Sequence, residues 1–600
     1  MDSLPVTHNL DANHKITGTI GAGPLALLAG RLTLALGSIL TLCLPATAAP
    51  APRAHGVIFF CPPKAESAIA ELKKIQADGY NLVEFASWPW TLPTSGSQME
   101  TTVTAVLNWC DAHDMHFFLM HNVQYDASDG AYENPMGALV WLTDWLRVMK
   151  GHKCVAGVML GNEVGPAAGK PKENPKWWAG FIADLKARHK TIEALNAAWG
   201  THFADFGAVT PPKAGSPGVA DYNRFAVQAF DRFYGILFHQ ALEPSLGKIF
   251  YSPKTMGDPP LHRACTNFSM ICWDDALSDY PQWRIKAMGD VSRMTGKAVF
   301  NSELHLYHEG YAFFGSPAKS RYRYFLSALN GEWMTASFAW GQWNNPGTQA
   351  IHRATPTILA DLRRLEPQLR AFSKATPEVH VVLSGPWAGD DVTAQRLYTE
   401  IANLGAGWEF VCPEDISRIA AGAVYIPKNT RLSLDACQAL ADLPASVRIV
   451  LAESNAMVDE YGHPVPARLR ETIAHRACTE YGAKHLIVGD GERLTSPYAD
   501  PAEVSYAAWS PERGHFGYPM VYPRLEARRV PNEKGWLVAV INHATGGKPV
   551  RAKLPWSKDK GCNVCELTAG GGPVDPNADQ LFAPLDVRVY QYPRKPASAR

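Results

Sequence analysis

The sequence has no excess of either charge. Its 57 Lys and Arg residues balance 57 Asp and Glu residues, and neither a basic stripe nor a long acidic run is present. Affinity for nucleic acid comes largely from cations that neutralise phosphates, so this chain is not expected to bind DNA or RNA. Internal repeats and low-complexity tracts are also absent, which excludes repeat architectures.

Motifs for metals and cofactors are scarce as well. The 11 cysteines are scattered, and the only close pair, Cys562 and Cys565, has no second half that could complete a zinc ribbon. No dinucleotide fingerprint follows the apolar run at Val379, where the sequence reads Ser384-Gly385-Pro386-Trp387. We therefore expect neither a metal nor a cofactor.

Long hydrophobic stretches are confined to the N-terminus. Arg31 precedes the apolar run Leu32–Leu44, and Ala46-Thr47-Ala48 offers small residues at a cleavage site. This pattern is typical of a signal peptide over residues 1–48 and predicts a secreted or periplasmic protein. An uncleaved membrane anchor is the alternative, since Ile16–Ala49 carries no charge except Arg31.

Strand and helix patterns alternate along the next 320 residues or so. Apolar, β-prone runs predict eight strands, at Gly56–Phe60, Asn81–Phe85, Phe117–Met120, Val155–Leu160, Lys248–Tyr251, Phe268–Trp273, Ala298–Phe300 and Ala336–Trp340. Helical patterns lie between and after them, at Ala65–Ala77, Thr101–His113, Pro135–Met149, Trp177–Trp199, Asp221–Leu242 and Thr355–Ser373. Strands separated by helices form right-handed parallel units, and eight of them predict a closed (β/α)8 barrel over residues 55–376.

Two smaller domains are expected after the barrel. Short apolar strands at Val379–Leu383, Glu409–Val411, Ala423–Ile426 and Val447–Leu451 are again spaced by helices. They predict an open doubly wound α/β domain over residues 377–502. Strands without intervening helices, at Trp536–Ile541, Val550–Leu554 and Val587–Tyr592, predict a small β-sandwich over residues 503–600.

Two of the barrel strands end in a polar residue and then a glutamate. The fourth strand leads into Gly161-Asn162-Glu163, and the seventh leads into Asn301-Ser302-Glu303. The C-terminal ends of barrel strands open onto one shared mouth. Cleavage of a glycosidic bond requires two carboxyl groups there, one to protonate the leaving oxygen and one to attack or stabilise the sugar carbon. The alternative is that both glutamates merely end buried strands.

These residues resemble a clan of retaining glycoside hydrolases with (β/α)8 barrels, and most of all the family 42 β-galactosidases. The resemblance rests on Gly161-Asn162-Glu163, on the stretch Leu195-Asn196-Ala197-Ala198-Trp199-Gly200-Thr201, and on the domain order. It implies that the middle domain is flavodoxin-like and that the chain forms a homotrimer through it. It also implies no metal in catalysis.

By this resemblance Glu163 is the general acid/base and Glu303 the nucleophile. Like-charge repulsion from an ionised Glu303 keeps the proton on Glu163 for the first step. Asn162 is expected to bind the 2-hydroxyl group of the sugar.

Further sugar contacts are expected from residues that end or follow strands. The expected substrate-binding residues, besides Asn162, are Trp88, His121, Asn122, Tyr251, Trp273 and Trp340. Tyr251 is expected to hydrogen-bond Glu303, with a core tyrosine as the alternative, and Trp340 is expected to lie beneath the sugar. One departure from the clan is Glu84 on the second strand, where relatives carry an Arg that holds the nucleophile. The zinc-binding cysteine cluster of some family 42 members has no evident counterpart.

The sequence thus predicts a retaining β-glycosidase acting on a carbohydrate, in the first place a β-galactosidase. Agarase-like, β-mannosidase and β-glucosidase activities are the alternatives within the class. A carbohydrate-binding barrel without catalysis is the alternative outside it.

Overall fold

The structure is a computed structural model that describes residues 53–593 apart from short stretches. These stretches are 89–90, 256, 276–281, 307–315, 342–345, 385–390, 454–456, 479, 481, 487–492, 506–518, 545–546 and 557–562. The expected signal peptide therefore lies outside the described residues. No helix among those described is long and apolar enough to cross a bilayer.

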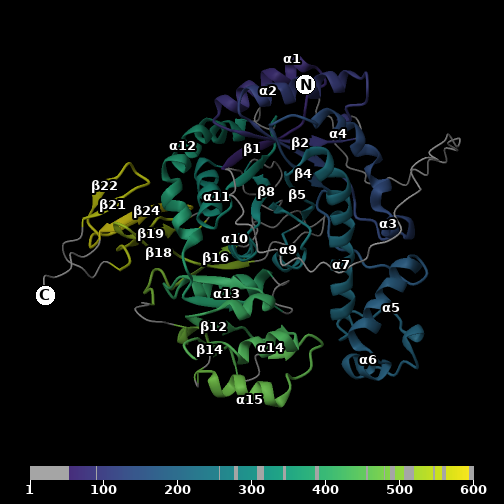
Figure 1. The fold of residues 1–600 in the computed structure, drawn as a ribbon. Coiled ribbons are helices and arrows are strands. Elements are labelled where there is room, and N and C mark those ends of the chain that lie inside the picture. Colours follow the sequence, from purple (N-terminus) through teal and green to yellow (C-terminus); the bar gives the residue numbers. More distant parts are fainter. Residues whose placement is uncertain are drawn as a thin grey trace. The chain divides into compact units, whose positions relative to one another are not determined.

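A parallel sheet in the first part of the chain forms a nearly closed barrel with helices around it (Figure 1). Its strands are β1 (Ala54–Phe59), β2 (Leu82–Ser87), β3 (His116–His121), β4 (Val155–Leu160), β5 (Phe250–Ser252), β6 (Lys254–Thr255), β7 (Met270–Asp275), β8 (Ala298–His305) and β9 (Met334–Phe338). Pro253 separates β5 from β6, and proline has no N–H group to donate to a neighbouring strand. β5 pairs with β4 while β6 pairs with β7, so the two segments act as one broken strand of an eight-stranded barrel. The predicted (β/α)8 fold is confirmed.

Alternate residues of each strand face the inside and the outside of the barrel. In β7, Met270 and Cys272 pack in the barrel interior, whereas Ile271 and Trp273 pack in the core between sheet and helices. Burying one such large apolar side chain stabilises the fold by about 1.5–3 kcal/mol. Gly157 in β4 is required by this packing, because a Cβ atom there would lie 2.3 Å from the ring of Phe118.

Helices follow the strands and surround the sheet (Figure 1). They are α1 (Ala65–Ala77), α2 (Gln98–Ala112), α3 (Asp129–Glu133), η2 (Pro135–Leu142), α4 (Thr143–Met149), α5 (Pro175–His189), α6 (Ile192–Trp199), α7 (Val219–Leu237), η4 (Phe238–Leu242), α8 (Glu243–Leu246), α9 (Pro259–Ala264), α10 (Gln282–Thr295), α11 (Pro317–Leu329) and α12 (Pro346–Lys374).

Two of the expected helices differ from the prediction. The helix expected at Trp177–Trp199 is broken at Lys190, whose φ of +65° ends α5, and α6 begins after its N-cap Thr191. Helix α12 begins nine residues before the expected start at Thr355 and continues through Pro356. The expected start at Thr355 is therefore wrong, because Pro356 lies inside the helix and does not begin it.

Two further sheets follow the barrel. The strands β10 (Val379–Val382), β11 (Trp408–Val411), β12 (Ala423–Ile426) and β14 (Arg448–Leu451) form a parallel sheet in the order β11-β10-β12-β14. This is the 2-1-3-4 order of flavodoxin-like folds, as predicted. An antiparallel sheet contains β18 (Glu526–Asn532), β19 (Gly535–Ile541), β24 (Val587–Pro593), β21 (Val564–Glu566) and β22 (Gly572–Val574). The fold class is thus confirmed, while the domain boundaries stay a prediction.

Candidate active site

Glu163 follows the C-terminal end of β4 in a tightly constrained loop. Gly161 has φ +83°, and a Cβ atom there would lie 2.7 Å from the hydroxyl oxygen of Tyr234 in α7. Glu163 itself has φ +53° and an exposed side chain. The backbone N–H of Val164 donates to the carbonyl of Lys254 at 2.9 Å, and the N–H of Lys254 donates to the carbonyl of Gly161 at 3.4 Å. Lys254 therefore holds both ends of the short segment that carries Glu163.

Glu303 lies near the C-terminal end of β8 and is only 7% exposed. Its carboxylate forms an ion pair with the ammonium group of Lys254, which also lies 3.2 Å from Asp274 at the end of β7. The Nε2 atom of His305 lies 3.3 Å from the other carboxylate oxygen of Glu303. One lysine thus contacts the nucleophile candidate with its side chain and the Glu163 segment with its backbone.

The charges in this cluster determine which carboxyl groups are ionised. Burial by itself lowers the pKa of Lys254, but Glu303, Asp274 and Glu84 raise it above its ordinary value. Burial raises the pKa of Glu303, and the attraction of Lys254 outweighs this and holds that pKa well below its usual range. Burial, together with repulsion from Glu303, raises the pKa values of Asp274 and Glu84 well above theirs. The cluster therefore favours the charged forms of Lys254 and Glu303 and disfavours ionisation of Asp274 and Glu84.

The same cluster bears on the question of a catalytic metal. Ligand atoms of Asp274, Glu303 and His305 lie within 4.8 Å of one another, which is a spacing that a metal ion could use. The ammonium group of Lys254 already contacts both carboxyl groups. A second cation there would be repelled, so these residues do not fit a metal site.

A second group of metal-ligand type lies at the opposite end of β4. Ligand atoms of Asp111, His152 and Cys154 lie within 4.8 Å of one another, and the thiol of Cys110 hydrogen-bonds that of Cys154. Thiolate, imidazole and carboxylate are the ligands that structural zinc takes, so these residues fit such an ion. The expectation that the zinc-binding cysteine cluster of some family 42 members has no counterpart stays a prediction. Cys154 precedes β4 while Glu163 follows it, so this group lies at the end of β4 away from Glu163.

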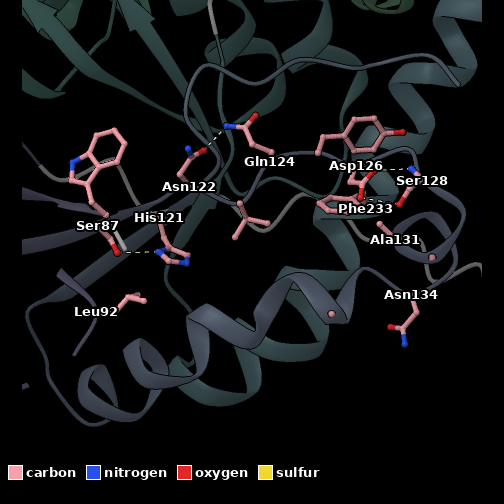
Figure 2. A pocket seen from close by; sticks show the side chains of 15 residues that line it. Ser87, Leu92, His121, Asn122, Gln124, Asp126, Ser128, Ala131, Asn134 and Phe233 are labelled. Atoms are coloured by element: carbon pink, nitrogen blue, oxygen red, sulfur yellow. Dashed lines mark hydrogen bonds between the residues drawn. The ribbon is translucent and has the colours of Figure 1, made fainter. Parts of the chain in front are cut away.

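Two of the expected sugar-binding residues, Asn122 and Asn162, lie beside Glu163, and Trp88 and His121 line a pocket together with Asn122. Asn122 accepts a hydrogen bond at 3.3 Å from the backbone N–H of Asn162, whose side-chain amide lies 3.4 Å from a carboxylate oxygen of Glu163. His121 ends β3 and hydrogen-bonds Ser87, while burial lowers the pKa of His121 to about 4. Trp88, His121 and Asn122 line one pocket of about 830 Å³ (Figure 2).

The other three expected residues lie elsewhere. Tyr251 is half-buried and packs against Phe238 of η4, with ring centres 4.4 Å apart, while Lys254 lies beside Glu303. Trp273 is fully buried and donates to Glu332, which corrects the expectation that it contacts sugar. The indole N–H of Trp340 donates to Glu71 of α1, and the ring borders His352 of α12.

The structure also adds residues that the sequence did not single out. Lys254 is the most important of them, and it follows a proline rather than an apolar run, so no strand pattern marks it. Phe338 at the end of β9 stacks on His305, with ring centres 5.1 Å apart. The aromatic ring beside the Glu303 cluster is therefore Phe338, where the sequence suggested Trp340. Glu84, noted as a departure from the clan, is fully buried within reach of the charges of Lys254 and Glu303.

Comparisons with known proteins agree with this fold. Residues 140–275 match the family model Glyco_hydro_42, described as Beta-galactosidase. This segment includes Glu163, Lys254 and Asp274, and it ends before Glu303. No curated protein matches the sequence significantly.

Solved structures of similar fold cover nearly the whole chain. An apo exo-carrageenase GH42 from Bacteroides ovatus is 16% identical, with a TM-score of 0.59 and coverage of 91% of this chain and 83% of that one. A β-galactosidase from Bacillus circulans sp. alkalophilus is 13% identical, with a TM-score of 0.60 and coverage of 90% and 99%. A β-galactosidase from the haloarchaeon Halorubrum lacusprofundi is 14% identical, with a TM-score of 0.60 and coverage of 90% and 99%. At these identities the likeness shows the fold.

The chain is a glycoside hydrolase with a (β/α)8 catalytic domain. This class follows from the barrel, the pair of glutamate carboxyl groups and the family match taken together. Within that class the chain is similar to the family 42 enzymes, as the sequence predicted.

Proposed function

We propose that the protein is a retaining β-glycosidase, in the first place a β-galactosidase, in which Glu303 is the nucleophile and Glu163 the general acid/base. The observation that carries this assignment is the buried ion pair of Lys254 with Glu303. A nucleophilic carboxylate must be ionised, and Lys254 keeps it so in a site where burial alone would protonate it. Glu163 is exposed on the neighbouring loop, where it can exchange a proton with the leaving group and with water.

The reaction follows from these positions in two steps. Glu303 attacks the anomeric carbon while Glu163 gives its proton to the departing glycosidic oxygen. The bond from the sugar to Glu303 removes the negative charge of that carboxylate. Glu163, now ionised, takes a proton from water, and the resulting hydroxide displaces Glu303 with net retention. Asn162 lies next to Glu163 and is the proposed partner of the 2-hydroxyl group.

The test separates the two glutamates by role. Glu303→Ala should lose activity on every substrate, whatever the leaving group. Glu163→Ala should still form the glycosyl-enzyme from a nitrophenyl glycoside, because a nitrophenolate leaves without protonation. Azide should then rescue Glu163→Ala and give a β-glycosyl azide. Rescue of Glu303→Ala with an α-product would exchange the two assignments, and full activity in both variants would refute the proposal.

The sugar is identified by a panel of nitrophenyl β-glycosides. We expect the β-galactoside to have the highest kcat/KM. A preference for the β-mannoside or β-glucoside, or cleavage of agarose oligosaccharides alone, would replace the galactosidase proposal by one of its alternatives. Binding of saccharides without any turnover would favour the non-catalytic alternative.

Location and assembly are part of the same proposal. We propose export directed by residues 1–48, supported by the charge and hydropathy pattern of that segment, and N-terminal sequencing of the mature protein should begin at Ala49. We also propose a homotrimer, supported by the flavodoxin-like order of the middle sheet. Light scattering that gives the mass of a monomer at working concentrations would contradict it.

A further inference from the structure

Strand β8 carries one residue more than the strands beside it, just before the nucleophile. Trp273 of β7 pairs with Asn301 of β8, but the next residue of β7, Asp274, pairs with Glu303. Ser302 is therefore an extra residue in β8. The register of β8 with β9 shifts over the same residues. An insertion of this kind is a β-bulge, and a bulge beside an active site re-aims a side chain.

The bulge decides which face of the sheet Glu303 lies on. Successive side chains of a strand point to opposite faces. Phe300 of β8 packs in the barrel interior, so regular alternation would place residue 303 on the outer face, toward the helices. The extra residue shifts the alternation by one. Leu304 consequently packs in the outer core, and Glu303 contacts Lys254 inside the barrel.

A buried carboxyl group joins the two strands immediately before the bulge. Glu332 lies between α11 and β9 and is fully buried. The indole N–H of Trp273 donates to a carboxyl oxygen of Glu332 at 3.0 Å. Burial raises the pKa of Glu332 to about 7, although the side chain of Asn301 lies near enough to lower it. Glu332 is thus close to both members of the pair Trp273 and Asn301, the last regular pair before β8 gains its extra residue.

Helix α11 holds Glu332 in place from outside the barrel. The backbone N–H of Glu332 donates to the carbonyl of Ser327 at 2.9 Å. Arg323 is buried in the same helix, and its charge attracts the carboxyl group. Trp273, like Glu332, is fully buried in this outer layer, so neither side chain can touch a substrate. Any effect of these groups on the reaction must therefore act through the position of the strands.

We propose that Glu332 is a positioning residue for the nucleophile, because it fixes β7 to β8 through Trp273 and Asn301 at the point where the bulge turns Glu303 into the barrel. This gives Trp273 a role other than the sugar contact that the sequence suggested. The proposal rests on the proposed function for the role of Glu303. The placement of Glu303 beside Lys254 does not depend on any reaction.

Substitutions of the donor and the acceptor test the positioning role by kinetics. Glu332→Leu removes the acceptor of the Trp273 N–H and should lower kcat on a nitrophenyl β-galactoside about 100-fold, the cost of a displacement of about 1 Å. KM should stay nearly constant, since the substituted side chain does not reach the substrate. Trp273→Phe removes the donor and should lower kcat in the same direction. Glu332→Gln keeps an oxygen acceptor and should recover most of the parental kcat.

Two comparisons separate positioning from a general loss of stability. Glu526→Gln is the matched control, because Glu526 is an equally buried carboxyl group whose partners are Arg528 and His543. It should lower stability and leave kcat unchanged. The double variant Trp273→Phe/Glu332→Leu should be no slower than Glu332→Leu, because both changes break one contact. Parental kcat in folded Trp273→Phe and Glu332→Leu, additive losses in the double variant, or an equal fall of kcat in Glu526→Gln would each overturn the proposal.

Crystal structures of the parent and of Trp273→Phe and Glu332→Leu test the proposal without turnover. We expect Glu303 to lie beside Lys254 in the parent and to be displaced from it in the variants, with a changed register of β8. An unchanged bulge and an unchanged contact of Glu303 with Lys254 in both variants would overturn the proposal. If the parent hydrolyses no glycoside, the proposed function fails, and this comparison still decides whether Glu332 positions Glu303.

Discussion

Replacing Lys254 with methionine removes one charge and keeps most of the volume of the side chain. The ammonium group of Lys254 is buried and pairs with both Glu303 and Asp274. Removing one partner of a buried ion pair leaves an uncompensated charge, at a cost of about 3–5 kcal/mol. Glu303 can avoid this cost by taking up a proton. Since 1.36 kcal/mol corresponds to one pKa unit, the pKa of Glu303 should rise by about two units or more.

The assay is the pH dependence of kcat/KM on a nitrophenyl β-galactoside. In Lys254→Met, the acidic limb of the profile should move to higher pH by about two units, so the loss of activity should be greatest at acidic pH. Lys297→Met is the matched control, because Lys297 lies just before β8, at the other end from Glu303, and donates to the carbonyl of His262. It should change stability without moving the limb.

Two results would refute this reasoning. One is an unchanged acidic limb in a folded Lys254→Met variant, which would mean that another group keeps Glu303 ionised. The other is an equal shift in Lys297→Met, which would mean that the effect is a general loss of structure. Thermal unfolding of both variants separates these outcomes.

Three further predictions follow from the structure. Gly161→Ala should lower kcat at least tenfold, because its Cβ atom would lie 2.7 Å from Tyr234 and displace the Glu163 segment; activity equal to that of the parent would contradict the constraint. Glu526→Gln should destabilise the fold by about 3–5 kcal/mol in chemical unfolding, since buried Glu526 binds Arg528, His543 and Tyr398, whereas Glu533→Gln in a turn should have little effect. Burial raises the pKa of Glu526, but Arg528 and His543 outweigh burial and hold the folded-state pKa below the unfolded value. The stabilisation of the fold by ionised Glu526 is therefore complete above about pH 4.3 and is lost as the pH falls through the folded pKa. A free energy of unfolding that does not fall with acid would contradict this prediction. A crystal structure should place the carboxyl groups of Glu163 and Glu303 roughly 5–5.5 Å apart, and a separation of about 6.5–9.5 Å would remove the retaining mechanism.

The fold was largely predictable because the barrel strands are continuous apolar runs. Parallel strands that are covered on both faces need apolar residues on both faces. Such an apolar run can be recognised in the sequence without knowing which strands pair with each other. The broken strand around Pro253 shows the limit. A proline inside an apolar run argues against a strand, and only the pairing of β5 with β4 and of β6 with β7 shows that the two pieces complete the barrel.

The sequence could predict which residues lie at the ends of strands. It was a weaker guide to which face of the sheet each side chain points toward. Glu163 follows β4 and Glu303 lies near the end of β8, and the C-terminal ends of the barrel strands face the mouth. Trp273 and Cys272 are neighbours on β7, yet one faces the outer core and the other the barrel interior. A shift of one residue exchanges these two faces. The sequence position of an aromatic residue near a strand end therefore does not decide whether its ring faces the sugar. Lys254 was missed because its role depends on three-dimensional proximity to residues 49 positions away.

The most direct test of the central claim is to trap the glycosyl-enzyme and find the residue that carries it. A 2-deoxy-2-fluoro-β-galactoside with a dinitrophenolate leaving group should label the protein once, because the fluorine slows both steps and the good leaving group compensates only in the first. Mass spectrometry of the digested protein should find the fluorosugar on Glu303. A label on Glu163 or Asp274, or an enzyme that turns over the compound without ever being labelled, would contradict the account.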